Sequence, residues 1–452
     1  MDLAGKPVVV VGLARSGIAA ARFLAGLGRQ VVATDRKTPA ELPEEALKLA
    51  DSGVRLELGG HRAETFASAG LVVVSPGVPW QSPELVAARA AGIPVIGELE
   101  LGARHIHGPV AAITGTKGKS TTTAALGAML REAGRDVRVG GNIGDAVTGL
   151  LKGATDETAF VLEVSSFQLE STESLRPKVA VFLNLSADHL DRHASFEEYG
   201  AAKARIFANQ TADDFAVVNA DDPNVMALAR ATRARMVRFG TGDAEARFVG
   251  PEARLRMGGH AASLFHRSDV KVPGDHIAMD LLAAATAASL MGAPPDAIRR
   301  AVSAFAGVEH VLERVAVVRG VAFYNDTKAT NVDAALKSIE SFATPVLPIL
   351  GGRYKGGDFV ALAPALARHG KAVLAIGEST DRITAALSAT VPVIACRSLK
   401  EAVEKGFERG APGDTVLLAP GCSSFDMFTD YAARGRAFKD EVRALAAREG
   451  HG

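Results

Sequence analysis

Short apolar runs alternate along the chain with stretches of helical composition, and this pattern predicts its secondary structure. Runs that are apolar throughout are typical of strands buried on both faces of a parallel sheet. The intervening stretches of about 10–15 residues predict crossover helices. The predicted strands are 7–11, 30–34, 71–74, 94–96, 109–113, 160–164, 179–183, 216–218, 321–324, 346–350, 372–376, 391–395 and 415–418.

The order of these elements predicts an α/β protein of three domains. We expect a Rossmann-like N-terminal domain over residues 1–98, a P-loop-type central ATPase domain over 99–308, and a Rossmann-like C-terminal domain over 309–452. Residues 239–272 are rich in Gly and Arg and predict small antiparallel strands.

Composition excludes several classes of protein. The 452 residues carry 51 Lys and Arg against 51 Asp and Glu, so the basic excess of a nucleic-acid or membrane-surface protein is missing. Two cysteines are too few for a disulfide framework. The most apolar predicted helix, Ile277–Met291, carries Asp280 and is not expected to span a bilayer. We therefore expect a soluble cytoplasmic monomer without a signal peptide, a nucleic-acid partner or membrane insertion.

The strongest motif is Ile113-Thr-Gly-Thr-Lys-Gly-Lys-Ser-Thr, in which an apolar run leads through a glycine turn into an alanine-rich stretch. Such a turn aims backbone N–H groups and the positive end of a helix at one point, which suits phosphate. Lys119 is then placed to reach the terminal phosphates, and the Ser120 hydroxyl to ligate Mg²⁺. Ile113 stands where a P-loop usually has glycine, so this is a shortened variant; the alternative is an ordinary turn before a helix.

Glu163 interrupts a predicted strand that is otherwise apolar on both faces. A buried carboxylate is costly unless it is paired or bound to metal, and the carboxyl end of a parallel strand is where α/β proteins bind ligands. A metal ligand is the favoured interpretation, and a buried ion pair is the alternative. The segment 184–193, which contains Asp188, His189, Asp191 and His193, offers ligands for a second cation or is simply a solvated loop.

Lys203 falls on the apolar stripe of a helix that Ser195 and Glu198 predict by capping-box spacing. Burial in that stripe lowers the pKa of a lysine, and a neutral amine can react with CO₂ to give a carbamate, an anionic metal ligand. The alternative is a lysine whose amine reaches out to water.

Polar loops follow several other predicted strands. Three lie in the last third of the chain, at 325–331, 351–359 and 419–426, and indicate either surface turns or one shared binding face. The N-terminal Gly12-x-Ala-x-x-Gly17 nearly matches a dinucleotide fingerprint, with Asp35 about where a ribose-binding acid would stand. This predicts a nucleotide or phosphosugar without specifying which.

Together these stretches resemble the Mur ligase family over essentially the whole chain. The Gly-Lys-Ser-Thr loop and residues 325–331 are similar to the wider family. The segments Glu163-Val-Ser-Ser-Phe-Gln-Leu-Glu170 and Pro420-Gly-Cys-Ser-Ser-Phe-Asp426 are similar to its D-glutamate-adding branch. The resemblance implies an ATP-dependent amide ligase of peptidoglycan precursor synthesis, with UDP-N-acetylmuramoyl-L-alanine and D-glutamate as substrates. It also implies a place for each substrate: the uridine diphosphate in the N-terminal domain, ATP in the central one and the amino acid in the C-terminal one.

The resemblance also implies roles for individual residues. Those implied to bind the UDP substrate are Ser16, Gly17, Asp35, Arg36, Lys37 and Asn142. Those implied to bind ATP are Gly115, Thr116, Lys117, Gly118, Lys119, Ser120, Thr121, Asp326, Lys328, Thr330 and Asn331. The implied D-glutamate pocket is Lys355, Ser424, Phe425 and Tyr431. Two Mg²⁺ ions are implied, with Ser120 and Glu163 on one, and His189 and a carbamylated Lys203 on the other. Lys119, His189, Lys203 and Lys328 are the implied catalytic residues.

Three positions depart from the family pattern. Lys117 stands where the family commonly has Asn, His276-Ile-Ala-Met-Asp280 replaces the adenine-contacting His-Asn-x-x-Asn, and Val311 replaces a phosphate-facing Arg. Alternative functions are a relative that adds another amino acid, a nucleotide-switch protein that binds partners, and a dehydrogenase that uses the N-terminal glycine turn.

Overall fold

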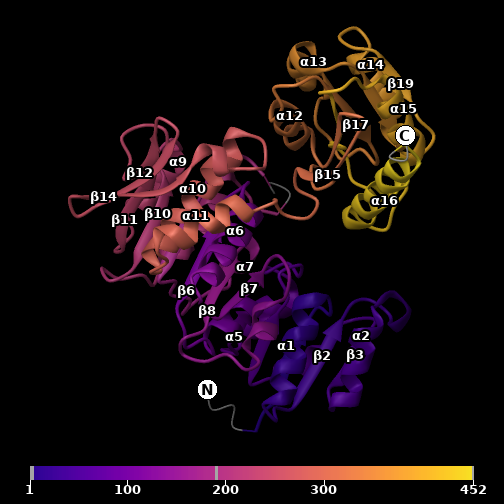
Figure 1. Ribbon diagram of the computed structural model, residues 1–452. Helices are drawn as coiled ribbons and strands as arrows, with labels where there is room; N and C mark the ends of the chain where they lie inside the picture. The colour runs from indigo at the N-terminus through magenta and orange to yellow at the C-terminus, as the bar shows by residue number, and fades with distance from the viewer. Residues whose placement is uncertain (1–4, 189–191, 450–452) are drawn as a thin grey trace. The chain divides into compact units, whose positions relative to one another are not determined.

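A computed structural model describes residues 5–188 and 192–449 (Figure 1). Its three mainly parallel sheets with intervening helices confirm the predicted three-domain α/β class. The chain divides into two compact units, one of Met1–Asp269 with Met279–Val302 and one of Val270–Ala278 with Ser303–Gly452. The first unit holds the first two sheets, and the domain boundaries at 98 and 308 stay predictions. Among the described helices, none is long and apolar enough to cross a membrane.

The first sheet is parallel, in the order β3-β2-β1-β4-β5. Its elements are β1 (Val8–Val11), α1 (Arg15–Gly26), β2 (Val31–Asp35), α2 (Glu44–Leu47), β3 (Arg55–Leu58), α3 (Ala63–Ala67), β4 (Leu71–Val74), α4 (Pro83–Ala90) and β5 (Val95–Gly97). The fully buried valines of β1 explain its central place. Because β2 and β4 flank β1, the strand order reverses there, and the crevice beyond its carboxyl end is a usual ligand site.

The second sheet has the order β14-β13-β12-β11-β10-β9-β6-β8-β7. Its elements are α5 (Glu98–Ala103), β6 (Val110–Thr114), α6 (Lys119–Glu132), β7 (Val137–Gly141), β8 (Ala159–Glu163), α7 (Ser166–Leu169), β9 (Val179–Phe182), α8 (Phe196–Ala204), β10 (Phe215–Asn219), α9 (Pro223–Ala229), β11 (Arg235–Phe239), β12 (Ala246–Val249), β13 (Glu252–Met257), β14 (His260–His266), α10 (Asp275–Leu290) and α11 (Pro295–Ala304). The predicted antiparallel strands are confirmed as β12–β14.

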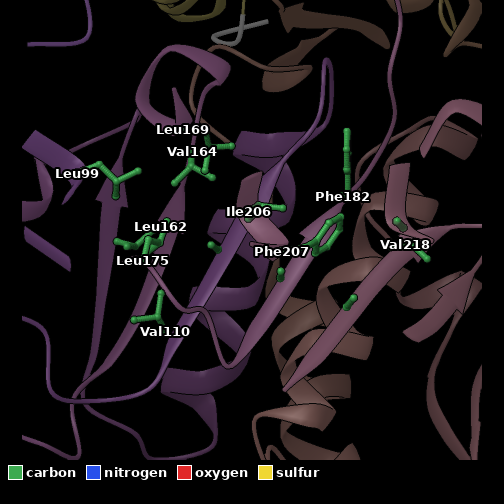
Figure 2. Close-up of a cluster of buried hydrophobic side chains, with 14 of the residues drawn as sticks. Leu99, Val110, Leu162, Val164, Leu169, Leu175, Phe182, Ile206, Phe207 and Val218 are labelled. Carbon is green, nitrogen blue, oxygen red and sulfur yellow. The ribbon is translucent and has the colours of Figure 1, made fainter. Parts of the chain in front are cut away.

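Alternate residues of the central strands form one hydrophobic core. Leu162 of β8 and Phe182 of β9 belong to it, and Ile206 and Phe207 pack against the same face (Figure 2). Glu163, the next residue along β8, lies on the opposite side of the pleat and pairs in register with Ile113 of β6. The alternation therefore directs Glu163 away from this core.

The third sheet has the order β15-β16-β20-β17-β18-β19, and only its β15–β16 pair is antiparallel. Its elements are β15 (Glu313–Val318), β16 (Val321–Asn325), α12 (Val332–Glu340), β17 (Val346–Gly351), α13 (Ala363–His369), β18 (Val373–Ile376), α14 (Thr380–Leu387), β19 (Val393–Ala395), α15 (Leu399–Arg409), β20 (Thr415–Leu418) and α16 (Tyr431–Glu449). The carboxyl ends of β16, β20 and β17 are neighbours, so the three polar loops do share one edge of the sheet.

Candidate active site

The N-terminal glycine loop joins β1 to α1 in a tight turn. Gly12 has φ +87°, and a Cβ added to Gly17 would lie 1.8 Å from the Gly12 carbonyl oxygen, so neither position accommodates a side chain without strain. The Asp35 carboxylate accepts hydrogen bonds from the Leu13 N–H at 2.6 Å and the Lys37 N–H at 2.9 Å. Asp35 therefore closes the loop as well as facing the space beyond it.

A cavity of about 750 Å³ opens at this loop. It brings together five of the six residues predicted for the UDP substrate: Ser16, Asp35, Arg36, Lys37 and Asn142. Gly17 supports the loop without lining the cavity. Sequence reasoning missed Arg15, His61 and Gln168, which also line it. Arg15 stood inside the glycine motif and could have been found there; its Nη2 donates to the carbonyl oxygens of Asn142 at 2.9 Å and Gly141 at 3.3 Å.

The second glycine loop joins β6 to α6, as predicted. Asn184, at the end of the neighbouring strand β9, holds this loop: its Oδ1 accepts from the Thr116 N–H at 3.1 Å and the Lys117 N–H at 2.8 Å. Its Nδ2 donates to the Lys117 carbonyl at 3.0 Å. Lys119 opens α6, and its Nζ donates to the carbonyls of Gly115 and Thr116. A lysine ammonium thus lies over a helix N-terminus, an arrangement that binds phosphate.

Gly118 and Thr121 complete the loop segment. Gly118 has φ +82°, and a Cβ there would come within 2.2 Å of Oδ1 of Asp280, on α10. Thr121 lies buried in the first turn of α6. Asp280, one of the departures from the family pattern, therefore lies directly against the phosphate-binding loop.

Glu163 is the central polar group of this region and is only 1% exposed. Its Oε2 accepts from the Ser120 hydroxyl at 2.7 Å, and its Oε1 from the Asn142 amide at 2.8 Å. The charge of Glu163 also acts on the buried Lys203, so both the metal-ligand interpretation and the alternative of a buried ion pair stay open. A carboxylate and a hydroxyl are hard oxygen donors that suit Mg²⁺, which keeps most of its other positions for water and phosphate oxygens.

Lys203 of α8 is 2% exposed, so its amine does not reach out to water. Its Nζ donates to the Gly115 carbonyl at 2.8 Å, the same oxygen that accepts from Lys119, and lies 4.7 Å from the centre of the Tyr199 ring. Burial, reinforced by the charge of Lys119, lowers the pKa of Lys203 to about 7. Ser195 caps α8 by accepting from the Glu198 N–H, which confirms the predicted helix start.

The predicted second cation cluster is only partly described. His189 and Asp191 lie outside the described residues. His193 is buried, and its ring nitrogens lie 3.0 Å from the Ser166 hydroxyl and 3.4 Å from a Glu170 oxygen. His193 thus engages α7 and its carboxyl end.

In the second unit, Asp326 follows β16 and is buried. It accepts hydrogen bonds from the Ser338 hydroxyl and the Leu312 N–H. Burial raises the pKa of Asp326 to about 6. Asn331 caps α12 through its Oδ1, which accepts from the Ala334 N–H at 2.8 Å. Lys328 and Thr330 lie between them and are half-buried.

The loops predicted for D-glutamate lie on this same unit. Lys355 is exposed after β17, and its Nζ lies 5.8 Å from the centre of the Phe425 ring. Ser424 is buried, whereas Phe425 and Tyr431 expose 58% and 42% of their surface. These loops therefore present a cation, a hydroxyl-bearing turn and two aromatic rings.

Three family models match the chain in order: "Mur ligase MurD-like, N-terminal domain" over residues 6–97, "Mur ligase middle domain" over 113–288, and "Mur ligase, glutamate ligase domain" over 312–422. The chain is 47% identical to the UDP-N-acetylmuramoylalanine–D-glutamate ligase of Acidobacterium capsulatum, over 98% of this chain and 97% of that one. It is 43% identical to the enzyme of the same name from Koribacter versatilis, over 99% of this chain and all of that one.

Solved structures show the same fold at lower identity. UDP-N-acetylmuramate-alanine ligase MurC from Thermotoga maritima matches with a TM-score of 0.62 and 20% identity, over 97% of this chain and all of that one. MurF ligase from Thermotoga maritima in complex with ADP matches with a TM-score of 0.62 and 16% identity, over 99% of this chain and all of that one.

Proposed function

The chain belongs to the Mur ligase family, and from this premise we propose that it joins D-glutamate to UDP-N-acetylmuramoyl-L-alanine at the expense of ATP. The product is an amide in the synthesis of peptidoglycan precursors. The proposal rests on relatives of this name that are 40–47% identical over nearly the full chain.

One observation in the structure supports it most directly. Asn142 lines the N-terminal cavity and also donates to Glu163, whose other oxygen accepts from Ser120 at the start of α6. The lining of the cavity is therefore linked through Asn142 and Glu163 to Ser120 of the phosphate-binding loop. A substrate held by its uridine diphosphate in the cavity can extend its carboxylate toward the terminal phosphate of a nucleotide on that loop.

The reaction needs the substrate carboxylate close to the terminal phosphate of ATP, because a free carboxylate has a poor leaving group and must first be phosphorylated. An oxygen of the L-alanyl carboxylate attacks the γ-phosphorus of ATP, the bond to the β–γ bridging oxygen breaks, and ADP leaves. The amine of D-glutamate then attacks the carbonyl carbon of the acyl phosphate. Inorganic phosphate departs with the bonding pair, and the amine gives up its proton.

The residues of the phosphate-binding loop position the reactants of these two steps and offset their negative charge. Two anions must approach each other, and the Lys119 ammonium with the backbone N–H groups of the helix N-terminus offsets their repulsion. Lys119 is held between two carbonyls now, and phosphate oxygens would replace them as acceptors. We assign Lys117 to the same phosphates, and Asp326, Lys328, Thr330 and Asn331 to the nucleotide.

Ser120 and Glu163 would hold Mg²⁺, since their oxygens are the donor type that this ion prefers. When bound, Mg²⁺ would neutralise phosphate charge. We assign His189 and Lys203 to a second ion. The pKa of about 7 leaves much of the Lys203 amine neutral at physiological pH, which is the form that reacts with CO₂ to give a carbamate. Lys355, Ser424, Phe425 and Tyr431 are assigned to D-glutamate.

The test is phosphate release from ATP with UDP-N-acetylmuramoyl-L-alanine and Mg²⁺, with and without D-glutamate. We expect release to depend on D-glutamate, and the product mass to increase by one glutamyl residue. Parallel reactions with L-glutamate, L-alanine and diaminopimelate test the alternative of a relative that adds another amino acid. Nucleotide hydrolysis that ignores every amino acid would contradict ligation and would favour a nucleotide switch.

A further inference from the structure

Arg434, in the first turn of α16, is 1% exposed. Its Nε donates to the Thr327 hydroxyl at 2.9 Å. Its Nη2 donates to the carbonyl oxygens of Thr327 at 3.1 Å and Cys422 at 3.2 Å. Its Nη1 is buried and has no hydrogen-bond partner. The guanidinium is therefore surrounded by protein, and one of its three nitrogens makes no hydrogen bond.

These contacts connect the loops that follow three neighbouring strands. Thr327 follows β16 and Cys422 follows β20, and Arg434 bonds to both. Gly352 follows β17, and a Cβ added there would lie 3.2 Å from Nη1 of Arg434. Since β16, β20 and β17 are adjacent in the sheet, one side chain bonds to two of these loops and lies close to the third. The same loops carry the residues assigned to nucleotide and D-glutamate.

Filling this space with the charged side chain of Arg434 lowers the stability of the fold. Within the described part of the chain it forms no ion pair, and its acceptors are one hydroxyl and two carbonyls. Burial lowers the pKa of Arg434 to about 10, so it is still charged at neutral pH. The nearby charge of Asp426 offsets this burial only in part, so the buried charge opposes folding, and an unbranched apolar side chain would fill similar volume without that cost. Stability alone does not account for an arginine here.

We propose that Arg434 is a positioning residue for the amino-acid substrate. It fixes the spacing between the loop of Thr327, the loop of Cys422 and the loop of Gly352, which carry the residues assigned to nucleotide and D-glutamate. It acts through these loops, because its own nitrogens are buried. This inference rests on the proposed function and adds a determinant of D-glutamate affinity to it.

The test compares R434M and R434K with wild type in steady-state kinetics for each substrate. We expect R434M to raise KM for D-glutamate about tenfold or more, since three hydrogen bonds from a charged donor are lost. R434K keeps the charge but not the forked geometry, so an intermediate KM is expected. KM for the UDP substrate, which binds the other unit, should stay within about twofold. Amide hydrogen exchange should quicken at 326–331 and 421–425 in R434M.

The matched control is R443M on the same helix, where Arg443 is exposed and lies 3.5 Å from Asp440. It should leave every KM unchanged. The inference is overturned if both Arg434 variants keep the wild-type KM for D-glutamate. It is also overturned if the KM values for D-glutamate, ATP and the UDP substrate rise together, since a merely structural role would produce that result. Should R434M fail to fold, R434K carries the same two tests. If the proposed function itself is wrong, the result is different from these two outcomes. In that case the wild-type protein shows no phosphate release that depends on D-glutamate.

Discussion

The two glycine loops of the first unit share a local design but differ in charge. Each follows a buried strand, β1 or β6, and leads into a helix. In each, an Asx side chain at or just after the end of a neighbouring strand accepts from the turn, one N–H in the first loop and two in the second. In the first loop that acceptor is the carboxylate of Asp35. In the second it is the neutral amide of Asn184.

This difference decides which ligand each loop can take. At the first loop the Asp35 carboxylate already accepts from the Leu13 N–H, and its other oxygen accepts from the Lys37 N–H. Asn184 brings no charge, and Lys119 and Lys203 both donate to the Gly115 carbonyl beside it. The second loop is thus suited to a triphosphate, whereas the first also presents an acidic acceptor for the hydroxyl groups of a nucleotide sugar. Backbone shape makes an anion site possible, and the side chains around it select the ligand.

The largest effect is expected from removing the ammonium that marks the second loop. Lys119→Ala should lower turnover by about 10³-fold while the fold stays intact, because the charge that offsets two converging anions is gone. Single-turnover phosphate release measures the loss of turnover, and circular dichroism measures whether the fold stays intact. Lys48→Ala, at an exposed lysine paired with Glu44, is the control and should behave as wild type. Near-normal turnover of Lys119→Ala would remove the basis for the ATP assignment.

Glu163 has no counterpart at the first loop, and Glu163→Gln tests what it contributes. The glutamine amide is uncharged and has only one acceptor oxygen. It therefore cannot replace both carboxylate oxygens, one of which accepts from Ser120 and the other from Asn142. We expect the Mg²⁺ concentration for half-maximal activity to rise about 10–100-fold. Glu57→Gln is the control, at a buried carboxylate of β3 that bonds to Thr65 and Arg55. An unchanged Mg²⁺ requirement in Glu163→Gln would show that this carboxylate is structural.

Exchanging the two Asx acceptors tests the comparison itself. Asn184→Asp puts a negative charge under the phosphates and loses the donor to the Lys117 carbonyl, so KM for ATP should rise about tenfold. Asp35→Asn weakens the first loop, and KM for the UDP substrate should rise by about the same factor. Each variant should leave the other KM unchanged. If both variants change both constants alike, the loops do not select their ligands separately.

The burial of Lys203 also affects the stability of the fold. The pKa of Lys203 is about 7 in the folded chain, against 10.5 for an ordinary lysine. Between these pH values the unfolded state binds more protons, so the free energy of unfolding should rise with pH from about 7 to about 10. Lys203→Met should lack that part of the rise, whereas Lys48→Met should keep it. Urea unfolding in CO₂-free buffer measures the slopes, and parallel curves for wild type and Lys203→Met would contradict the burial of a titrating amine.

Much of the fold could be predicted because its signals are local. The all-valine run of β1, the Gly-Lys-Ser-Thr turn and the Ser195 cap each act within a few residues, and each is where the pattern placed it. A carboxylate inside an apolar strand was equally visible at Glu163. Of Lys203 the pattern allowed two interpretations, and only the packing of α8 beside the loop excluded the solvent-exposed one.

What escaped prediction depends on strands that are distant in sequence. Nothing near Arg434 distinguishes it from other charged residues of a polar helix, since its acceptors lie 107 and 12 residues away. Arg15 joins the cavity through carbonyls 126 and 127 residues away. His189 and the assigned ligand roles stay predictions.

The sequence by itself therefore determined the elements, their turns and the kind of chemistry that each turn offers, because steric and capping preferences act over a few bonds. Only the tertiary structure decided which polar groups meet. The contacts of Ser120 with Glu163 and of Lys203 with Gly115 span 43 and 88 residues, and both follow from the order of strands in a sheet. That order is set by the burial of whole faces, a property that no single segment carries.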